Sequence, residues 1–243
     1  METVKIQKYF SDCAIMSRRA AEEEIKKGKV TVNGALATLG LRIDPEHDVV
    51  IYKGRKILPP KREKTYVLLN KPRGIVTTLS DEKGRPTVLS LLNGLNTRVY
   101  PIGRLDFNSD GLLLLSDDGD LTYKLTHPRH KIPKIYHVTV KSAVSEEQLK
   151  KLSSALVIDG YKIQPVTTEI IKKEPSSTTL KMTLFEGRNR QIRKMCALCG
   201  LTVTRLTRVS IGTISLGNLP TGKWRYLTEA EIEYLKRESA PHD

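Results

Sequence analysis

Apolar and polar residues alternate with two different periods near the start of the chain. Ser17 precedes the run RRAAEEEIKKG, which Gly28 ends, and this is the pattern of a capped helix. The segment Val30–Gly34 then alternates valines with polar residues and ends in Asn-Gly, a strong hairpin signal. Asp48–Tyr52 is typical of a closing strand. We therefore expect a compact unit of two helices and a small sheet between Ile6 and Tyr52.

The rest of the chain contains more strand-like than helix-like segments. Strands are expected at Tyr66–Leu69, Ile75–Leu79, Leu112–Leu115, Ile135–Val140, Ile163–Ile171, Thr179–Phe185 and Val203–Leu216. Helices are expected at Ser145–Leu152, Asn189–Cys199 and Thr228–Arg237, of which the first and last begin with the spacing of a capping box. Strands and helices do not alternate in βαβ order, so the pattern predicts a mainly antiparallel α+β domain.

A short segment rich in proline and charge separates these two regions. The sequence LPPKREKT at residues 58–65 has the composition of a linker. We therefore place an N-terminal module at residues 1–58, a linker at 59–65 and a second domain at 66–243. The expected fold is α+β, with a small N-terminal α/β module joined to a mainly antiparallel mixed β-sheet domain flanked by helices.

The charge balance indicates a polyanionic partner. The chain has 41 basic and 27 acidic residues, a formal net charge of +14. Nucleic acid is the leading candidate, because phosphate contacts by Lys and Arg release counterions. No segment approaches the ~20 apolar residues that cross a bilayer, and the first residues lack an apolar signal-peptide core. We expect a cytoplasmic protein with no membrane partner, and its three cysteines do not form a disulfide framework.

One carboxylate stands out in the stretch YPIGRLDFNSDGLLLLSDDGD. Asp106 lies between Leu105 and Phe107, and apolar neighbours can hold a carboxylate in a partly buried site. From these residues alone, Asp106 fits a catalytic group and a structural turn residue equally well. The pattern DDGD lacks the longer ligand set of a calcium loop, so no metal site is predicted. We interpret the other acidic residues of the stretch as turn residues: Asp110, Asp117, Asp118 and Asp120.

The segment LFEGRNRQIRKMCALCG combines a basic and an apolar helix face. The basic residues are dense enough to favour phosphate contacts over a merely solvated face, which remains the alternative. The apolar face includes a Cys-x-x-Cys pair, Cys196 and Cys199, which we interpret as core residues because no second ligand pair stands at zinc spacing. The basic residues are Arg188, Arg190, Arg193 and Lys194.

A tyrosine and three histidines fall within LTHPRHKIPKIYHV. Tyr136, next but one to Lys134, can stack on a base or can be an ordinary strand aromatic. A proline between the histidines argues against one metal-binding helix face, so we assign His127, His130 and His137 structural or RNA-contact roles. The chain contains no Walker A loop, no GxGxxG and no Ser-His-Asp signature, which argues against nucleotide-dependent and nicotinamide enzymes.

Four motifs, taken together, resemble the RsuA/RluB-type pseudouridine synthases. They are KPRGIVTT at Lys71–Thr78, GRLDFNSDGLLLL at Gly103–Leu115, KIY at Lys134–Tyr136 and EGRNRQIRKM at Glu186–Met195, in that order. The N-terminal stretch SRRAAEEEIKKGKVTVNG is similar to a small RNA-binding module of the ribosomal-protein-S4 type. One departure is Ile135, where the family often has threonine. The resemblance spans nearly the whole chain.

The resemblance implies a role for individual residues. Asp106 would be the catalytic aspartate, Tyr136 would stack on the target uracil, and Arg193 would pair with the aspartate. Ile192 would pack against the base, and Arg104 would reach into the RNA where the nucleotide leaves its stack. The family uses no metal and no organic cofactor. Further RNA contacts are expected from Lys71, Arg73, Arg188, Arg190, Lys194, Arg18, Arg19 and Lys29.

The implied reaction converts one uridine of ribosomal RNA to pseudouridine. The base is flipped out, detached at nitrogen-1, rotated and rejoined through carbon-5. Asp106 would act as a nucleophile or as a base at the ribose, and both roles remain open. Arg193 in place of lysine favours large-subunit over small-subunit rRNA, and we expect a monomer. The competing hypotheses are a non-catalytic RNA-binding protein and, supported only by the acidic cluster DDGD, a metal-dependent nuclease.

Overall fold

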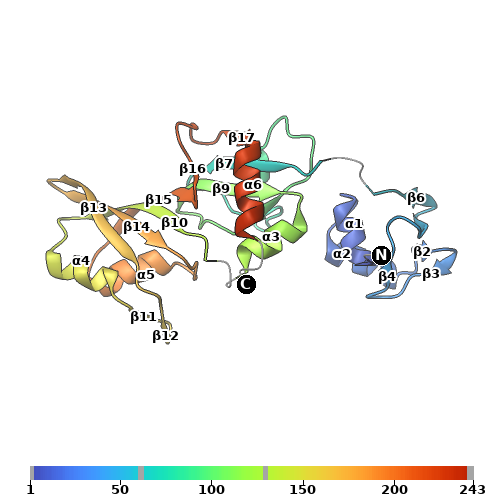
Figure 1. Cartoon of the computed structure of the whole chain (residues 1–243), viewed down its shortest axis with the longest axis horizontal. Helices are drawn as coiled ribbons and strands as arrows, with labels where there is room; N and C mark the ends of the chain where they lie inside the picture. The colour runs from blue at the N-terminus through green and yellow to red at the C-terminus, as the bar shows by residue number, and fades with distance from the viewer. Residues whose placement is uncertain (1–2, 60–62, 128–130, 240–243) are drawn as a thin grey trace. The chain divides into compact units, whose positions relative to one another are not determined.

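The protein is described from a computed structural model that covers residues 3–59, 63–127 and 131–239 (Figure 1). The chain divides into two compact units. The first contains Met1–Lys64, and the second contains Thr65–Ser116 and Asp120–Asp243. Part of the predicted linker, residues 60–62, lies outside the described residues, as does His130.

The first unit packs two helices against a small antiparallel sheet. The side chain of Ser17 accepts a hydrogen bond from the backbone N–H of Ala20, which confirms the predicted helix cap. Ile6, Phe10 and Val30 are fully buried in its core. The elements are β1 (Val4–Lys5), α1 (Ile6–Asp12), α2 (Arg18–Lys26), β2 (Val30–Val32), β3 (Ala35–Leu36), β4 (Arg42–Ile43), β5 (Val50–Tyr52) and β6 (Arg55–Ile57). Strand β1 pairs with β4, and the larger sheet has the order β3-β2-β5-β6.

The second unit is built on one long mixed sheet. Its main order is β13-β14-β10-β15-β9-β7-β17, with β16 paired to β15 and β8 paired to β9. Only the β9–β15 pairing is parallel among the described strands, so the predicted mainly antiparallel α+β domain is confirmed. The strands are β7 (Tyr66–Lys71), β8 (Tyr100–Ile102), β9 (Asp110–Ser116), β10 (Lys134–Lys141), β11 (Val157–Ile158), β12 (Tyr161–Lys162), β13 (Thr167–Glu174), β14 (Ser177–Leu184), β15 (Val203–Ile211), β16 (Ile214–Ser215) and β17 (Trp224–Tyr226).

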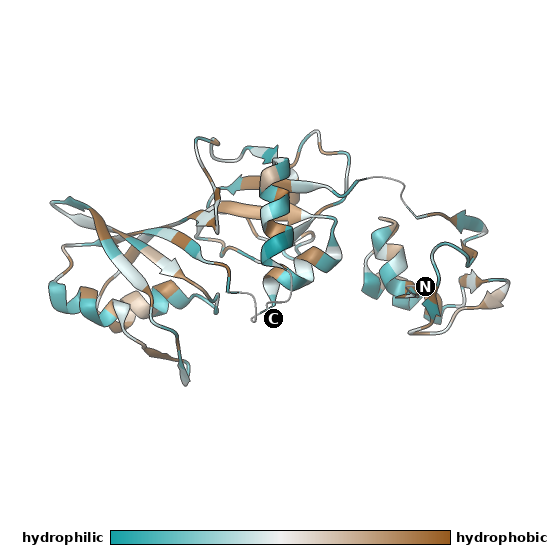
Figure 2. Cartoon of the chain, viewed as in Figure 1, coloured by the Kyte–Doolittle hydropathy of each residue, from teal (hydrophilic) through white to brown (hydrophobic). Residues whose placement is uncertain are grey.

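Helices cover the two halves of this sheet differently. On the β10-β14-β13 half, α4 (Glu146–Ser153) and α5 (Gln191–Leu198) contribute Leu152 and Met195 to one buried cluster. On the β9-β7 half, α3 (Gly119–Thr126) and α6 (Glu229–Glu238) cover one face, and the loops around η1 (Val88–Leu91) cover the other. The outer face of α6 is largely hydrophilic in Figure 2, as expected of a helix that covers a sheet.

The four leucines of β9 follow from burial on both faces. Leu112 and Leu114 belong to the cluster under α3 and α6, whereas Leu113 and Leu115 face the η1 side. Each is at most 1% exposed. A strand that is covered on both faces needs no alternation of polar residues, which explains the run of four leucines. This central strand supports the loop that precedes it, Gly103–Ser109.

Several sequence predictions are confirmed. Both capping boxes form, with Ser145 and Gln148 at α4 and with Thr228 and Glu231 at α6. Cys196 and Cys199 are buried core residues.

Over residues 3–59, 63–127 and 131–239, no group of three potential metal ligands occurs. No helix in this part of the chain is both long and apolar enough to cross a bilayer.

Other predictions are wrong. The segment Ile75–Leu79 forms no strand, because Gly74 turns the chain and Val76 makes only an isolated bridge. The expected strand Ile163–Ile171 begins only at Thr167, and the expected strand Val203–Leu216 is broken by a turn between β15 and β16. Helix α3 was not expected, since its two buried leucines are too few to give a clear helical period.

Asp110 is not a turn residue. It is the first residue of β9, is 6% exposed, and its Oδ2 accepts a hydrogen bond from Arg205 Nε at 3.2 Å. The next residue, Gly111, has a φ of +104°, and a Cβ there would lie 2.3 Å from the carbonyl oxygen of Arg208. The motif Asp-Gly therefore marks a close parallel contact between β9 and β15, which the local pattern cannot distinguish from a turn.

Candidate active site

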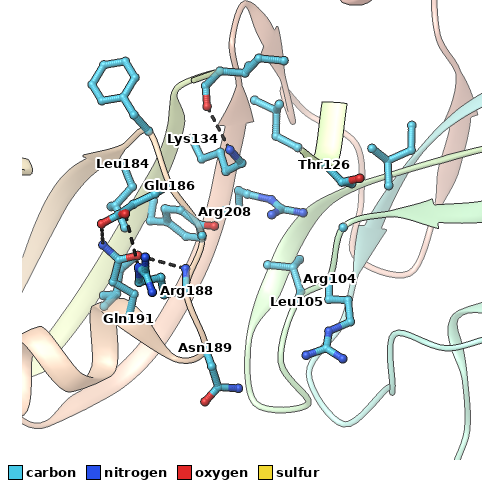
Figure 3. A pocket seen from close by; sticks show the side chains of 18 of the residues that line it. Arg104, Leu105, Thr126, Lys134, Leu184, Glu186, Arg188, Asn189, Gln191 and Arg208 are labelled. Carbon is cyan, nitrogen blue, oxygen red and sulfur yellow. Dashed lines mark hydrogen bonds and ion pairs between the residues drawn. The ribbon is translucent and has the colours of Figure 1, made fainter. Parts of the chain in front are cut away.

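A pocket of about 650 Å³ opens in the second unit beside the loop Gly103–Ser109 (Figure 3). Its lining comes from this loop, from β10, from β15 and from the segment that leads into α5. The pocket brings together several residues that the sequence assigned to the site. These are Arg104, Asp106, Tyr136, Arg188, Arg190 and Ile192.

The loop that carries Asp106 is fixed through its backbone. The hydroxyl of Thr77 donates to the carbonyl of Leu105 at 2.7 Å, and the N–H of Gly74 donates to that of Phe107 at 2.8 Å. Together with the bonds made by Lys71 and Arg193, every carbonyl from Leu105 to Ser109 accepts a hydrogen bond. The motif KPRGIVTT is therefore a cradle for this loop, and the catalytic candidate is held before any substrate arrives.

Lys71 is buried, which corrects its expected role as an RNA contact. The side chain is fully buried, and its Nζ donates to the carbonyls of Pro72, Asp106 and Ser109 at 3.0, 3.2 and 2.9 Å. Burial lowers the pKa of Lys71 to about 8, against the opposing pull of the Asp110 and Asp106 carboxylates. An ammonium with three carbonyl acceptors and no exposed surface cannot reach a phosphate, so Lys71 holds the loop instead.

The arginine nearest to the Asp106 carboxylate is Arg190. Its Nη1 lies 3.9 Å from Asp106 Oδ2, and both side chains are partly exposed. Arg193, the expected partner, instead donates to the carbonyl of Asn108 at 2.8 Å and to that of Val203 at 3.4 Å. Arg193 therefore fixes the backbone of the loop, and the nearby Asp106 charge acts to raise the Arg193 pKa, against the larger lowering by burial. The predicted pairing of Arg193 with Asp106 stays a prediction.

The residue that precedes α5 has an uncommon backbone conformation. Arg190 has a φ of +52°, in the left-handed region that non-glycine residues rarely adopt. Such strain persists where neighbouring contacts fix it, and here Gln191 donates to Glu186 and accepts from the N–H of Arg188. The guanidinium of Arg188 lies over the ring of Tyr161, 3.1 Å from its centroid. This segment therefore presents cations at the pocket mouth in a fixed arrangement.

Two apolar side chains form a further part of the lining. Tyr136 lies on β10, is half-buried and packs against the buried clusters of both halves of the sheet. Ile192, in the first turn of α5, is 4% exposed. A planar ring and a branched aliphatic side chain beside a carboxylate are suited to hold a flat, extruded base.

The sequence analysis missed three cations that line the pocket: the exposed Lys131 and the less exposed Lys134 and Arg208. Lys134 opens the KIY motif, and burial, together with the charge of Arg208, lowers the pKa of Lys134 to about 8. Arg208 lies on β15, is 4% exposed and directs its guanidinium into the pocket (Figure 3). No local signal identified Arg208, whereas the position of Lys134 two residues before Tyr136, on the same strand face, was an available signal.

The remaining predicted RNA contacts lie outside the pocket. Arg73 is exposed and reaches the carbonyl of Thr204, and Lys194 pairs with Asp159. The three N-terminal candidates belong to the first unit, where all are exposed: Arg18, Arg19 and Lys29. Lys29 lies 3.3 Å from a carboxylate oxygen of Glu24.

Known proteins are similar to this chain along nearly its whole length. The family model described as RNA pseudouridylate synthase matches residues 65–198. An uncharacterized RNA pseudouridine synthase of Aquifex aeolicus is 38% identical over 97% of this chain and 94% of its own length. The ribosomal large subunit pseudouridine synthase B of Bacillus subtilis is 37% identical over 96% of this chain and 95% of its own length.

A further relative and a solved structure extend the match to the fold. The dual-specificity RNA pseudouridine synthase RluF of Escherichia coli strain K12 is 38% identical over 95% of this chain and 77% of its own length. A crystal structure of a pseudouridylate synthase superposes with a TM-score of 0.69 at 30% identity, covering 96% of this chain and 99% of that one. The chain belongs to the RNA pseudouridylate synthase family.

Proposed function

We propose that this protein isomerises one uridine of ribosomal RNA to pseudouridine and that Asp106 is its catalytic residue. The observation that carries the proposal is the loop Leu105–Ser109, in which every carbonyl is hydrogen-bonded while the Asp106 carboxylate remains accessible in the pocket. A turn residue of purely structural use does not require such support. Relatives named for ribosomal and dual-specificity RNA activity support RNA as the substrate.

The proposed reaction begins with a uridine extruded from the RNA. Tyr136 stacks on the uracil and Ile192 packs against it, which offsets the loss of stacking in the RNA. Arg104, exposed at the pocket mouth, occupies the space that the nucleotide leaves. Arg190 lies 3.9 Å from the Asp106 carboxylate, which attacks the ribose or accepts a proton from it.

The first unit is proposed as an RNA-binding module of the ribosomal-protein-S4 type, with residues 66–243 as the catalytic domain. Its exposed cations Arg18, Arg19 and Lys29 would contact phosphates, as would Arg73, Arg188 and Lys194 in the second unit. Large-subunit rRNA is the proposed substrate, since a Bacillus subtilis relative is named for that subunit. We propose that the protein acts as a monomer.

The substitution Asp106→Asn tests the catalytic assignment. Amide and carboxylate have nearly the same shape, so the variant is expected to bind rRNA as the wild type does and to form no pseudouridine. Glu82→Gln, which removes an exposed carboxylate outside the pocket, is the matched control and should retain full activity. The measurements are RNA affinity and the pseudouridine content of an unmodified rRNA transcript. Full conversion by Asp106→Asn would refute the assignment.

A further inference from the structure

The pocket contains two cations of low exposure that the proposed reaction has not used. Lys134 on β10 donates to the carbonyl of Ile132 at 3.0 Å, and Arg208 on β15 donates through Nε to the carbonyl of Leu112 at 2.8 Å. Over the described ranges, neither side chain lies within ion-pair distance of a carboxylate. We call Lys134 and Arg208 the cation pair.

The cation pair lies in an environment where burial makes a charge costly. Arg208 is 4% exposed, and its Nη2 is buried without a hydrogen-bond partner in the part of the chain that the structure describes. Burial and the neighbouring guanidinium lower the pKa of Lys134. A buried, uncompensated charge destabilises a fold, so its presence in a pocket indicates that the compensating negative charge comes from a ligand.

The sheet places the cation pair beside the base-stacking residue. Tyr136 is the cross-strand neighbour of Arg208, and Gly111 is the neighbour of Arg208 on the other side. The absence of a Cβ at Gly111 permits this close approach. Figure 3 shows the Arg208 guanidinium between Lys134 and Leu105, the residue before Asp106. The cation pair is therefore in the same pocket as the proposed nucleophile, next to the proposed base platform.

The cation pair lies deep in the pocket, and this position favours contact with the base of the nucleotide over contact with the RNA backbone. Arg104, Arg188 and Arg190 are exposed at the mouth, where phosphates of the RNA would pass. The buried Arg208 lies deeper, and an extruded nucleotide enters a pocket base first. Uracil offers two carbonyl oxygens as acceptors at its edge.

We propose, on the basis of the proposed function, that Lys134 and Arg208 hold the negative charge of the uracil ring while it is detached from the ribose. When the C1′–N1 bond breaks, the bonding electron pair stays on the uracil and spreads to its oxygens O2 and O4. The ribose either bonds through C1′ to an Asp106 oxygen or gives a proton to it. Later C5 bonds to C1′ while the C1′–O bond to Asp106 breaks or, in the other case, while Asp106 returns its proton to the ribose. A proton then leaves C5 and N1 gains a proton, so the isomerisation balances and the Asp106 carboxylate is regenerated.

This arrangement favours the transition state over the bound substrate. The uracil ring is neutral in the RNA and acquires charge only as the glycosidic bond breaks. Donors that are fixed before the reaction stabilise that developing charge without reorganisation. Lys134 and Arg208 meet this condition, because the carbonyls of Ile132 and Leu112 hold them in place while further N–H donors remain available to a ligand.

The test compares two transcripts of the target rRNA region, one with uridine and one with 5-fluorouridine. Fluorine withdraws electrons and makes the detached ring a more stable anion, which reduces the need for cations. Under single-turnover conditions with saturating enzyme, Lys134→Met should cleave the uridine glycosidic bond about 100-fold more slowly than the wild type, as does loss of one oxyanion donor. On the fluorinated transcript the deficit should fall to less than about 10-fold, because less charge needs stabilisation.

Two further variants serve as controls for this experiment. Lys134→Arg keeps the charge and should recover most of the rate, which also guards against a folding defect in the methionine variant. Lys141→Met removes an exposed charge from the end of the same strand, outside the pocket, and should match the wild type within about twofold. An equal deficit on both transcripts would overturn the inference, as would weaker RNA binding with an unchanged rate. A wild-type protein that converts neither transcript would instead overturn the proposed function.

Discussion

A buried lysine under the Asp106 loop and a partly buried lysine in the pocket illustrate two uses of the same charge. Burial is the leading cause that lowers the pKa of Lys71 and of Lys134 to about 8. The ammonium of Lys71 is surrounded by three backbone carbonyls and touches no solvent. Lys134 makes one such bond and lines the pocket beside Arg208. A satisfied cation shapes a loop, whereas an unsatisfied one is available to a ligand.

The largest expected effect separates the two lysines by stability. Lys71→Met leaves backbone carbonyls under the Asp106 loop without a donor, so the free energy of unfolding should fall by about 3 kcal/mol. Lys134→Met removes one bond and a poorly compensated charge, so its change should stay within about 1 kcal/mol. Denaturant unfolding of both variants measures the difference. Equal losses of unfolding free energy in the two variants would show that Lys71 and Lys134 have the same structural role.

A smaller effect is expected from the cradle of the loop. Thr77→Val removes the hydroxyl that bonds both backbone groups of Leu105 and should cost about 1–2 kcal/mol of stability. The loosened Asp106 should also lower kcat by about 10-fold with KM unchanged, since the carboxylate is less well positioned. Thr168→Val is the matched control, because that buried hydroxyl has no partner among the described residues. A kcat that does not change would argue that the cradle serves folding alone.

The smallest effect concerns pH. The folded protein holds Lys71 at a pKa of about 8, against a usual value of 10.5. Between these values the unfolded chain binds more protons, so this lysine makes the free energy of unfolding rise with pH from about 8 to 10.5. Stability measured across this window should rise less steeply in Lys71→Met than in the wild type. If stability rose equally steeply with pH in both proteins, the result would contradict a buried, titrating ammonium at Lys71.

The sequence was informative where local pattern and structure agree. The capping residues Ser145 and Thr228, the apolar strand β9 and the buried cysteines follow from periodicity and composition. The motif that contains Asp106 was visible, but its local chemistry did not distinguish a turn residue from a catalytic one. The structure adds the carbonyl donors, which come from residues far away in the chain.

The rest depended on tertiary contacts that no local pattern records. The burial of Lys71 reverses its expected role, and Arg193 is directed to a backbone carbonyl while Arg190 approaches the carboxylate. Arg208 becomes a pocket residue only through its pairing beside Tyr136 and Gly111. These outcomes are set by strand order and helix placement, and residue type alone does not determine them.

The central claim is tested most directly by mapping pseudouridines in rRNA from cells that lack the gene. The account predicts that one position loses its modification, that the wild-type gene restores it, and that the Asp106→Asn gene does not. Restoration by the Asp106→Asn gene, or a pseudouridine map that does not change when the gene is lost, would contradict the account.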